Sequence, residues 1–243
     1  MAIRSLVNGL IAVALAPECA VCRNPLIDPL GSPVCLECWD AIAAMRPPLC
    51  TQCGEPLPSW RVLSLEAGRC PRCRRREPAV SAARAIGAYA GSLRGIVQAL
   101  KYRGCESTAK RLGAHMRRAG VELIAACDVV VPVPLHPRRL RRRGFNQADL
   151  LARELGPPLL RALVRVKKTP SQTGLPAARR HANVRHAFAL GPDTGVEGLR
   201  VLLVDDVCTT GATLDACARV LRDGGAADVS ALTAARAVAR PPE

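Results

Sequence analysis

The hydrophobic pattern of the chain switches between short apolar runs and helical periodicity. Residues 201–204, VLLV, form an uninterrupted apolar run of the length of a buried strand. Leu214, Ala218 and Leu221 then recur at helical spacing until Gly224 ends the run. A buried strand followed at once by an amphipathic helix is the repeating unit of an α/β fold.

The same alternation extends upstream and downstream of this unit. The pattern predicts further strands over residues 85–90, 128–134, 163–166 and 229–233, and helices over residues 93–104, 109–118 and 146–155. With the strand at 201–204, these segments predict a five-stranded α/β core. Charge, composition and motifs then indicate what this core carries.

Two carboxylates and a glycine-containing loop follow the central strand. Asp205 and Asp206 are expected where that strand ends, and a loop leads from there into the helix through Thr209, Thr210, Gly211, Ala212 and Thr213. Free backbone N–H groups and the dipole at a helix N-terminus suit a phosphate, and the threonine hydroxyls add donors. Because carboxylates would repel the phosphate, we expect them to face neighbouring ribose hydroxyls. The pattern therefore indicates a ribose 5-phosphate site, the alternative being a strand end with solvated acids and a helix-capping threonine.

The segment Asp205–Thr213, DDVCTTGAT, resembles the phosphoribosyl pyrophosphate (PRPP) motif of type I phosphoribosyltransferases. The resemblance implies a parallel sheet with helices on both faces, and Mg²⁺ bound with PRPP. It also implies that Asp205 and Asp206 are catalytic and hold the ribose hydroxyls, while the loop through Thr213 holds the 5′-phosphate. Thr209 stands where several purine-salvage members carry an acid, so purine salvage is not expected.

A strongly basic segment follows the strand predicted at 128–134. Five arginines fall within the six positions 138–143, which we interpret as a basic loop able to neutralise several phosphates. A charge run of this kind is also typical of a solvated face. The phosphoribosyltransferase resemblance implies that the turn at Leu135, His136 and Arg138 binds pyrophosphate. The remaining arginines are candidates for contact with nucleic acid: Arg139, Arg141, Arg142 and Arg143.

Residues 170–186 have no apolar period and many polar groups. By resemblance, this segment matches the flexible loop that closes over PRPP, where a lid excludes water and brings cations to the leaving group. The candidate pyrophosphate and lid residues are Lys168, Gln172, Arg179, Arg180 and Asn183.

Eight of the twelve cysteines form four C-x-x-C pairs near the N-terminus. Two such pairs complete one tetrahedral Zn²⁺ site, so the sequence predicts two structural zinc sites rather than a disulfide framework. Sequential pairing is the simplest arrangement, an interleaved one stays open, and an iron–sulfur cluster is less favoured by the spacing. We expect a double zinc ribbon over residues 17–78 and a phosphoribosyltransferase domain over residues 79–240. The predicted ligands are Cys19, Cys22, Cys35 and Cys38 at one site and Cys50, Cys53, Cys70 and Cys73 at the other.

Net charge and the N-terminus bear on partners and location. A net charge of +15 with a pI near 10.0 favours polyanionic partners, although an arginine-preferring genome explains part of the excess. The apolar run Leu10–Ala16 is too short to span a bilayer, and Pro17 disfavours cleavage of a signal peptide. We therefore expect an amphipathic N-terminal helix, no membrane span and a cytoplasmic protein.

The order of the motifs is more specific than any one of them. The C-x-x-C pairs, VPVPLHPRRLRRRGFNQ, T-x-x-Q-x-x-L and DDVCTTGAT occur in that order, and nearly the whole chain resembles the ComF (ComFC-like) family. The resemblance implies a role in natural competence and in handling imported single-stranded DNA.

Two classes of function follow from these features. One is a Mg²⁺-dependent phosphoribosyltransferase whose acceptor the sequence does not identify. The other is a catalytically inactive PRPP-fold protein that binds single-stranded DNA, or that recruits a competence helicase or another partner through its zinc ribbon. The low aromatic content, 2%, weakens the DNA-binding alternative, because tolerant single-strand binding uses stacking side chains.

Overall fold

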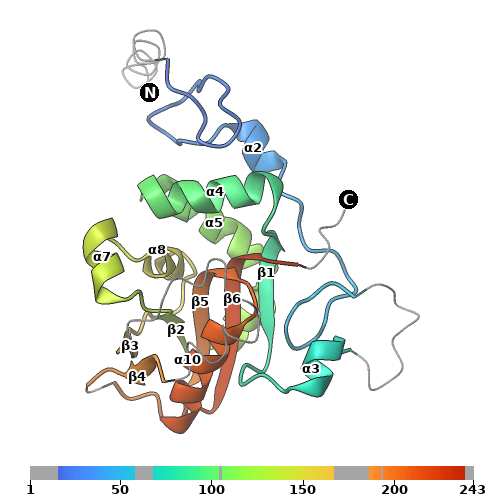
Figure 1. The fold of residues 1–243 in the computed structure, drawn as a ribbon, viewed down its shortest axis with the longest axis vertical. Coiled ribbons are helices and arrows are strands. Elements are labelled where there is room, and N and C mark those ends of the chain that lie inside the picture. Colours follow the sequence, from blue (N-terminus) through green and yellow to red (C-terminus); the bar gives the residue numbers. More distant parts are fainter. Residues whose placement is uncertain (1–15, 58–67, 104–105, 167–185, 193, 239–243) are drawn as a thin grey trace.

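The centre of the molecule is a four-stranded parallel sheet in the order β1-β6-β5-β2 (Figure 1). The computed structural model describes residues 16–57, 68–103, 106–166, 186–192 and 194–238. The strands are β1 (Ala83–Ala88), β2 (Val129–Pro132), β5 (Arg200–Cys208) and β6 (Asp228–Arg236). Every pair is parallel, so the carboxyl ends of all four strands lie at one edge of the sheet.

The prediction of a five-stranded core was wrong in one strand. β3 (Leu163–Arg165) pairs antiparallel with β4 (Phe188–Leu190) as a separate two-stranded sheet, and β4 was not predicted. Val164 and Val166, on either side of Arg165, are exposed, so this apolar run is not sandwiched between two layers. Within the described residues, the edge strand β2 is extended only by an isolated parallel bridge between Val130 and Leu159.

Helices cover both faces of the parallel sheet, as the phosphoribosyltransferase resemblance implied. One apolar cluster joins the sheet to α4 (Gly91–Arg103), α5 (Glu106–Ala119) and α8 (Gln147–Arg153). A second cluster on the opposite face joins it to α10 (Ala212–Asp223) and to the β3–β4 ribbon. Leucine, valine and alanine make up most of both clusters, as the scarcity of aromatic residues requires. The short helix α6 (Val121–Ala126) was not predicted.

The basic segment is a helix, not the predicted loop. Pro137 opens α7 (Pro137–Arg143), and Gly144 ends it with a φ of 83°. Proline at the first helical position and glycine just past the end are the normal boundaries of a helix, and they outweigh the repulsion within the arginine run. The following helix, α8, is capped as predicted, because the Asn146 side chain accepts a hydrogen bond from the Ala148 N–H at 3.2 Å.

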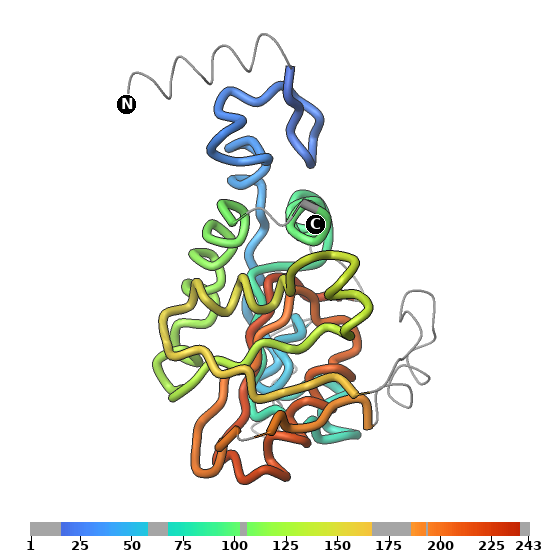
Figure 2. The backbone as a smooth tube through the Cα atoms, turned by 90° about the vertical axis from the view of Figure 1, so that its left-hand side faces the viewer, coloured from blue at the N-terminus to red at the C-terminus, as the bar shows by residue number. Residues whose placement is uncertain are grey.

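The two cysteine-rich segments pack on different parts of this α/β unit. The first contains α2 (Leu36–Asp40) and projects from one end of the molecule, beyond α4 and α5 (Figure 2). The second contains α3 (Pro71–Arg75) and lies beside β1 (Figure 1). The division of the chain at residue 78 stays a prediction. Among the described residues, no helix has both the length and the apolar character needed to cross a bilayer.

Candidate functional site

The acidic pair lies within the last part of β5 rather than after it. Asp205 pairs in register with Thr233 of β6, and the strand continues to Cys208. Asp206 is buried and Asp205 is partly exposed. Asp205 Oδ1 accepts a hydrogen bond from the Asp206 N–H at 2.8 Å, and Asp206 Oδ1 accepts one from the Val207 N–H at 3.0 Å. One oxygen of each carboxylate is thus held by local backbone.

Lys101, which the sequence analysis did not identify, forms an ion pair with this acidic pair. It lies near the end of α4, which crosses above the carboxyl edge of the sheet (Figure 1). Lys101 Nζ is 2.5 Å from Asp206 Oδ2 and 5.9 Å from the centroid of the Tyr89 ring. Burial alone would lower the pKa of Lys101, but the charge of Asp206 raises it. Asp206 is therefore neutralised by a cation from the chain itself.

Asp205 has a different electrostatic environment. Burial raises the pKa of Asp205 well above its ordinary value, and repulsion from Asp206 adds to that effect. Two adjacent carboxylates cannot both ionise freely without cations around them. A cationic ligand or metal bound beside Asp205 would favour loss of its proton.

The loop after β5 forms the N-terminus of α10. Gly211 is the N-cap with a φ of 76°, a conformation that favours glycine, and the helix begins at Ala212 rather than at the predicted Leu214. Thr210 Oγ1 accepts a hydrogen bond from the Ala212 N–H at 3.4 Å. Thr209, Thr210 and Thr213 are each partly exposed. The first-turn N–H groups of a helix have no intrahelical acceptor, so this loop offers donors to an anion beside the acidic pair.

The predicted pyrophosphate turn is the start of α7. Leu135 and His136 are partly exposed and Arg138 is exposed. His136 Nδ1 accepts a hydrogen bond from the Arg138 N–H at 3.2 Å, so His136 caps the helix. This hydrogen bond gives His136 a structural role, and a role for the turn in binding pyrophosphate stays a prediction.

The arginines of α7 fall into two groups. Arg141 and Arg142 are exposed, whereas Arg139 and Arg143 are partly buried. Arg143 Nη1 donates to Gln147 Oε1 at 2.5 Å. Burial lowers the pKa of Arg143, while the charge of Asp206 acts in the opposite direction. The charge of Asp206 thus acts on Arg143 across the site.

Arg165 is a second cation that the sequence analysis missed. It extends from β3, and its guanidinium lies 5.3 Å from the centroid of the Phe188 ring. Burial lowers the pKa of Arg165, as does the charge of Arg139, whereas Asp205 raises it. Lys101 thus contacts the acidic pair directly, and the charges of Arg143 and Arg165 act on it electrostatically. The lid candidates Lys168, Gln172, Arg179, Arg180 and Asn183 lie outside the described residues.

The cysteines form two clusters in sequential pairing, which resolves the choice left open by the spacing. Within each cluster the four Sγ atoms lie within 4.8 Å of one another, and none of the eight is in a disulfide. Cys19 and Cys38 Sγ are 3.9 Å apart, and Cys53 and Cys70 Sγ are 3.6 Å apart. Four thiolates around one Zn²⁺ at about 2.3 Å would lie about 3.8 Å from each other. Both clusters fit zinc.

Backbone N–H groups support thiolates in both clusters. Burial opposes ionisation of Cys19, but hydrogen bonds from the backbone lower its pKa to about 6. Cys50 accepts hydrogen bonds from the N–H groups of Cys53 and Cys70. Its pKa is lowered to about 4, chiefly by the side-chain hydrogen bond with Cys53. A thiolate is the form that binds a metal, and these contacts favour one thiolate in each cluster.

Comparison with known proteins agrees with this arrangement. Residues 140–242 match the phosphoribosyl transferase domain model, and residues 10–74 match the double zinc ribbon domain model. The chain is 33% identical over 231 residues to "Competence protein F" of Haemophilus influenzae, covering 90% of this chain and 97% of that one. The chain belongs to the ComF family.

Two further ComF relatives extend the comparison. "DNA utilization protein YhgH" of Salmonella typhimurium is 34% identical over 227 residues, covering 87% of this chain and 93% of that one. "Competence protein ComFC" of Bacillus subtilis is 38% identical over 109 residues, 44% of each chain. The predicted family, the fold class and the two four-cysteine zinc-binding sites are thereby confirmed.

Proposed function

We propose that this ComF protein binds PRPP with Mg²⁺ at the carboxyl edge of β5 and transfers the phosphoribosyl group to an acceptor, acting in the cytoplasmic handling of imported single-stranded DNA. The main support for this proposal is that Asp205 and Asp206 lie beside the N-terminus of α10, which Gly211 caps. Donors for a phosphate and acceptors for a diol are thus adjacent. The phosphoribosyl transferase domain match supports the same function.

Different residues would bind different parts of the substrate. The amides and hydroxyls from Thr209 to Thr213 would hold the 5′-phosphate, and the two carboxylates would accept hydrogen bonds from the ribose hydroxyls. As pyrophosphate leaves, positive charge develops on the ribose, and the carboxylates would stabilise that charge. Arg143 and Arg165 would favour the departing anion electrostatically. Mg²⁺, which prefers carboxylate and phosphate oxygens, would supply neutralisation of the pyrophosphate charge when bound.

Calorimetry with PRPP and Mg²⁺ tests this proposal directly. We expect binding by the zinc-loaded wild-type protein and at least about a hundredfold weaker binding by Asp205→Asn/Asp206→Asn, because two charged hydrogen-bond acceptors for the ribose are lost. The matched control is Asp223→Asn, which removes an exposed carboxylate from the end of α10. Equal binding by the double variant and the control, or no binding by the folded wild type, would contradict the proposal.

A second candidate function is direct binding of single-stranded DNA. It is favoured by Arg141 and Arg142, which are exposed in the last turn of α7. Phosphate contacts make affinity fall with salt, so Arg141→Gln/Arg142→Gln should reduce the slope of log K against log salt by about 1.4. The control is Arg74→Gln/Arg75→Gln, which removes the same charge from exposed positions of α3. Equal slopes for the two variants would exclude α7 as the DNA-binding surface.

A third candidate function is the recruitment of a protein partner, such as a competence helicase, through the first ribbon. Ile27, Leu30 and Leu36 are exposed, with Ile27 at 94%. Large apolar side chains gathered on one small segment are typical of protein-binding surfaces. Loss of partner binding in Ile27→Ser/Leu36→Ser, with PRPP binding unchanged, would assign recruitment to this ribbon.

A further inference from the structure

We propose that Arg236 is a positioning residue through which the second four-cysteine site, Cys50, Cys53, Cys70 and Cys73, holds the loop 209–213 in its ligand-binding shape. The identity of the ligand, a sugar phosphate, rests on the proposed function. It assigns to zinc at the second site a role that zinc at the first site does not have.

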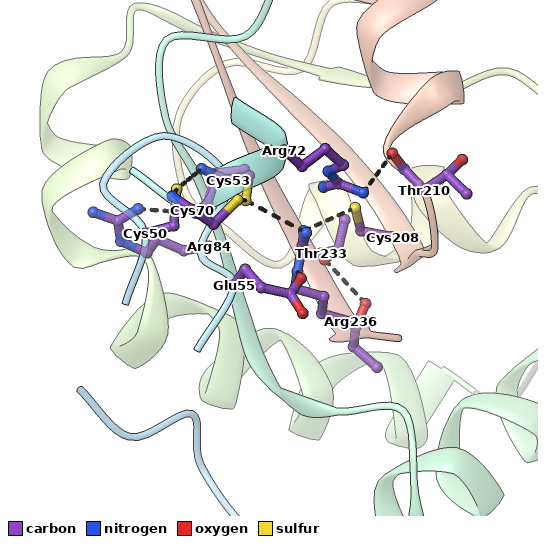
Figure 3. A network of polar contacts seen from close by, with 12 residues as sticks. Cys50, Cys53, Glu55, Cys70, Arg72, Arg84, Cys208, Thr210, Thr233 and Arg236 are labelled. Atoms are coloured by element: carbon purple, nitrogen blue, oxygen red, sulfur yellow. Dashed lines mark hydrogen bonds and ion pairs between the residues drawn. The ribbon is translucent and has the colours of Figure 1, made fainter. Parts of the chain in front are cut away.

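Arg236 connects the two places directly. It is the last residue of β6 and is 2% exposed. Its Nε donates to Glu55 Oε2 at 2.8 Å, its Nη2 to Cys53 Sγ at 3.5 Å and its Nη1 to Cys208 Sγ at 3.3 Å (Figure 3). Cys53 is a predicted zinc ligand, and Cys208 immediately precedes the loop. One buried guanidinium therefore joins a metal ligand to the base of the loop.

The surroundings make this arrangement hard to replace. A buried cation requires a nearby anionic partner, which Glu55 supplies, and the two sulfur atoms accept its remaining hydrogen bonds. A guanidinium carries donors in a fixed planar fork, so it can reach all three acceptors at once. A lysine in its place would keep the charge and lose this geometry.

A second contact runs from α3 to the loop. Arg72 lies between the ligands Cys70 and Cys73, and its Nη1 donates to the Thr210 carbonyl oxygen at 3.1 Å (Figure 3). Cys70 is the N-cap of α3 and Cys73 lies within the helix, so the position of this helix depends on two metal ligands. Thr210 is within the segment proposed to hold the 5′-phosphate.

The chain that leaves α3 reaches the helix that follows the loop. Arg76 Nη2 is 3.7 Å from Asp215 Oδ2, and the Ala79 N–H donates to Asp215 Oδ1 at 2.7 Å. Asp215 is in the first turn of α10. The second ribbon thus contacts both the loop and the helix whose N-terminus the loop forms.

The first four-cysteine site has a different neighbourhood. It packs on α4 and α5, and Trp39 stacks on His115 of α5 with ring centroids 5.9 Å apart. Arg111 of α5 lies 4.9 Å above the Trp39 ring. These contacts are made with helices other than α10. The first site is therefore the internal control for the second.

Thermodynamic linkage gives the coupling a reciprocal form. If zinc at the second site holds the loop in its binding shape, a ligand on the loop must raise the affinity of that site for zinc. We expect the tighter binding to be visible as slower release. All four cysteines of the second cluster are buried, whereas Cys22 of the first is exposed, so a chelator should remove the second zinc more slowly. The two sites can then be followed as two kinetic phases.

The experiment compares Arg236→Met and Arg236→Lys with Arg111→Gln as the control at the first site. A chelator with a metal-sensitive dye follows zinc release, and hydrogen exchange follows residues 207–215 in the ligand-free protein. We expect Arg236→Met to accelerate the slow phase and the exchange of the loop about tenfold, the effect of roughly 1.4 kcal/mol. Arg236→Lys should lie between Arg236→Met and the wild type, and Arg111→Gln should change neither.

Arg72→Gln keeps the coupling testable if Arg236→Met does not fold, because Arg72 is exposed. We expect this variant to release zinc at the wild-type rate. Its loop should exchange about threefold faster, because one hydrogen bond to a neutral carbonyl oxygen is lost. Unchanged exchange in whichever Arg236 variant folds, or an equal increase in Arg111→Gln, would overturn the inference.

Ribose 5-phosphate as a probe separates this inference from the proposed function. Slower release of the second zinc in the presence of ribose 5-phosphate supports both. Absence of sugar-phosphate binding, together with faster exchange in Arg236→Met, overturns the proposed function and leaves the coupling intact. Normal PRPP binding with unchanged exchange overturns the coupling alone.

Discussion

The two four-cysteine sites have the same ligands and different surroundings. The first shares an apolar cluster with α4, α5 and the sheet, through residues such as Leu26, Val34 and Trp39. The second forms a cluster of its own four cysteines, and among the described residues Leu57 is the one partly buried hydrophobic side chain packed against it. The first ribbon is therefore supported by the main core, whereas the second depends on its metal and on polar contacts. Equal ligand sets do not imply equal roles.

The two ribbons also support different parts of the proposed site. Val21 of the first ribbon packs on Gly95 of α4, where an added Cβ would lie 2.8 Å from Val21 Cγ1. The same helix carries Lys101 to Asp206. The first ribbon thus supports the side of the site with the carboxylates, and the second supports the side with the phosphate loop.

Removing one cysteine ligand from each site should show the largest difference in stability between the two ribbons. We expect Cys53→Ser to lower the free energy of unfolding by about 5 kcal/mol or more, because metal binding is the folding energy of a segment without a core. Cys22→Ser, at an exposed ligand, should cost about 2 kcal/mol. Thermal denaturation followed by circular dichroism measures both, with zinc content as the control. Equal losses would show that the two sites are energetically equivalent.

Lys101→Met should test the side of the site that the first ribbon supports. Removing one partner of a buried ion pair leaves Asp206 uncompensated, which should lower stability by about 3 kcal/mol. Hydrogen exchange of the loop 209–213 should not change, since Lys101 contacts Asp206 and the Tyr89 ring rather than the arginines that hold the loop. Lys110→Met, at an exposed position of α5, is the matched control. A stability equal to that of the control would mean that the ion pair contributes nothing.

The smallest expected effect is a pH dependence at Asp205. Its pKa is raised in the folded protein by burial, so the stability that its proton supports is complete below the ordinary pKa and is lost as pH rises through the folded pKa. Asp205→Asn should remove this loss and raise the melting temperature above that pKa by about 2–4 °C. Affinity for PRPP with Mg²⁺ should conversely rise with pH in the wild type. A stability profile with the same slope in Asp205→Asn would contradict this assignment.

The central part of the fold was predictable because its signals are local. An apolar strand, two acids, threonines and a glycine fall at fixed offsets in β5 and α10, and each C-x-x-C pair fixes its own geometry. Pro137 and Gly144, which mark the two ends of α7, are equally local signals. The arginine run between them was nevertheless interpreted as a loop. The predicted catalytic and lid roles stay predictions.

The remaining features depend on tertiary placement. A short, mostly apolar run such as residues 163–166 has no periodicity that separates a central strand from a two-stranded ribbon. Lys101 looks like an ordinary charged residue at a helix end until α4 is placed above Asp206. Arg236 is 181 positions from Glu55, and no local pattern pairs them. The available signal was an arginine three residues after a predicted apolar strand, which needs partners wherever it is buried.

The contacts of Trp39 with His115 and Arg111 give the molecule an optical reporter. The chain has two tryptophans, and the other, Trp60, falls in sequence between the C-x-x-C pairs of the second site. Along the sequence, each four-cysteine site therefore has one indole of its own. In a Trp60→Phe protein, emission would come from the first site alone, and quenching by the histidine and arginine beside Trp39 would disappear if that ribbon separated from α5. A single fluorimeter trace would then time the departure of the first ribbon from α5.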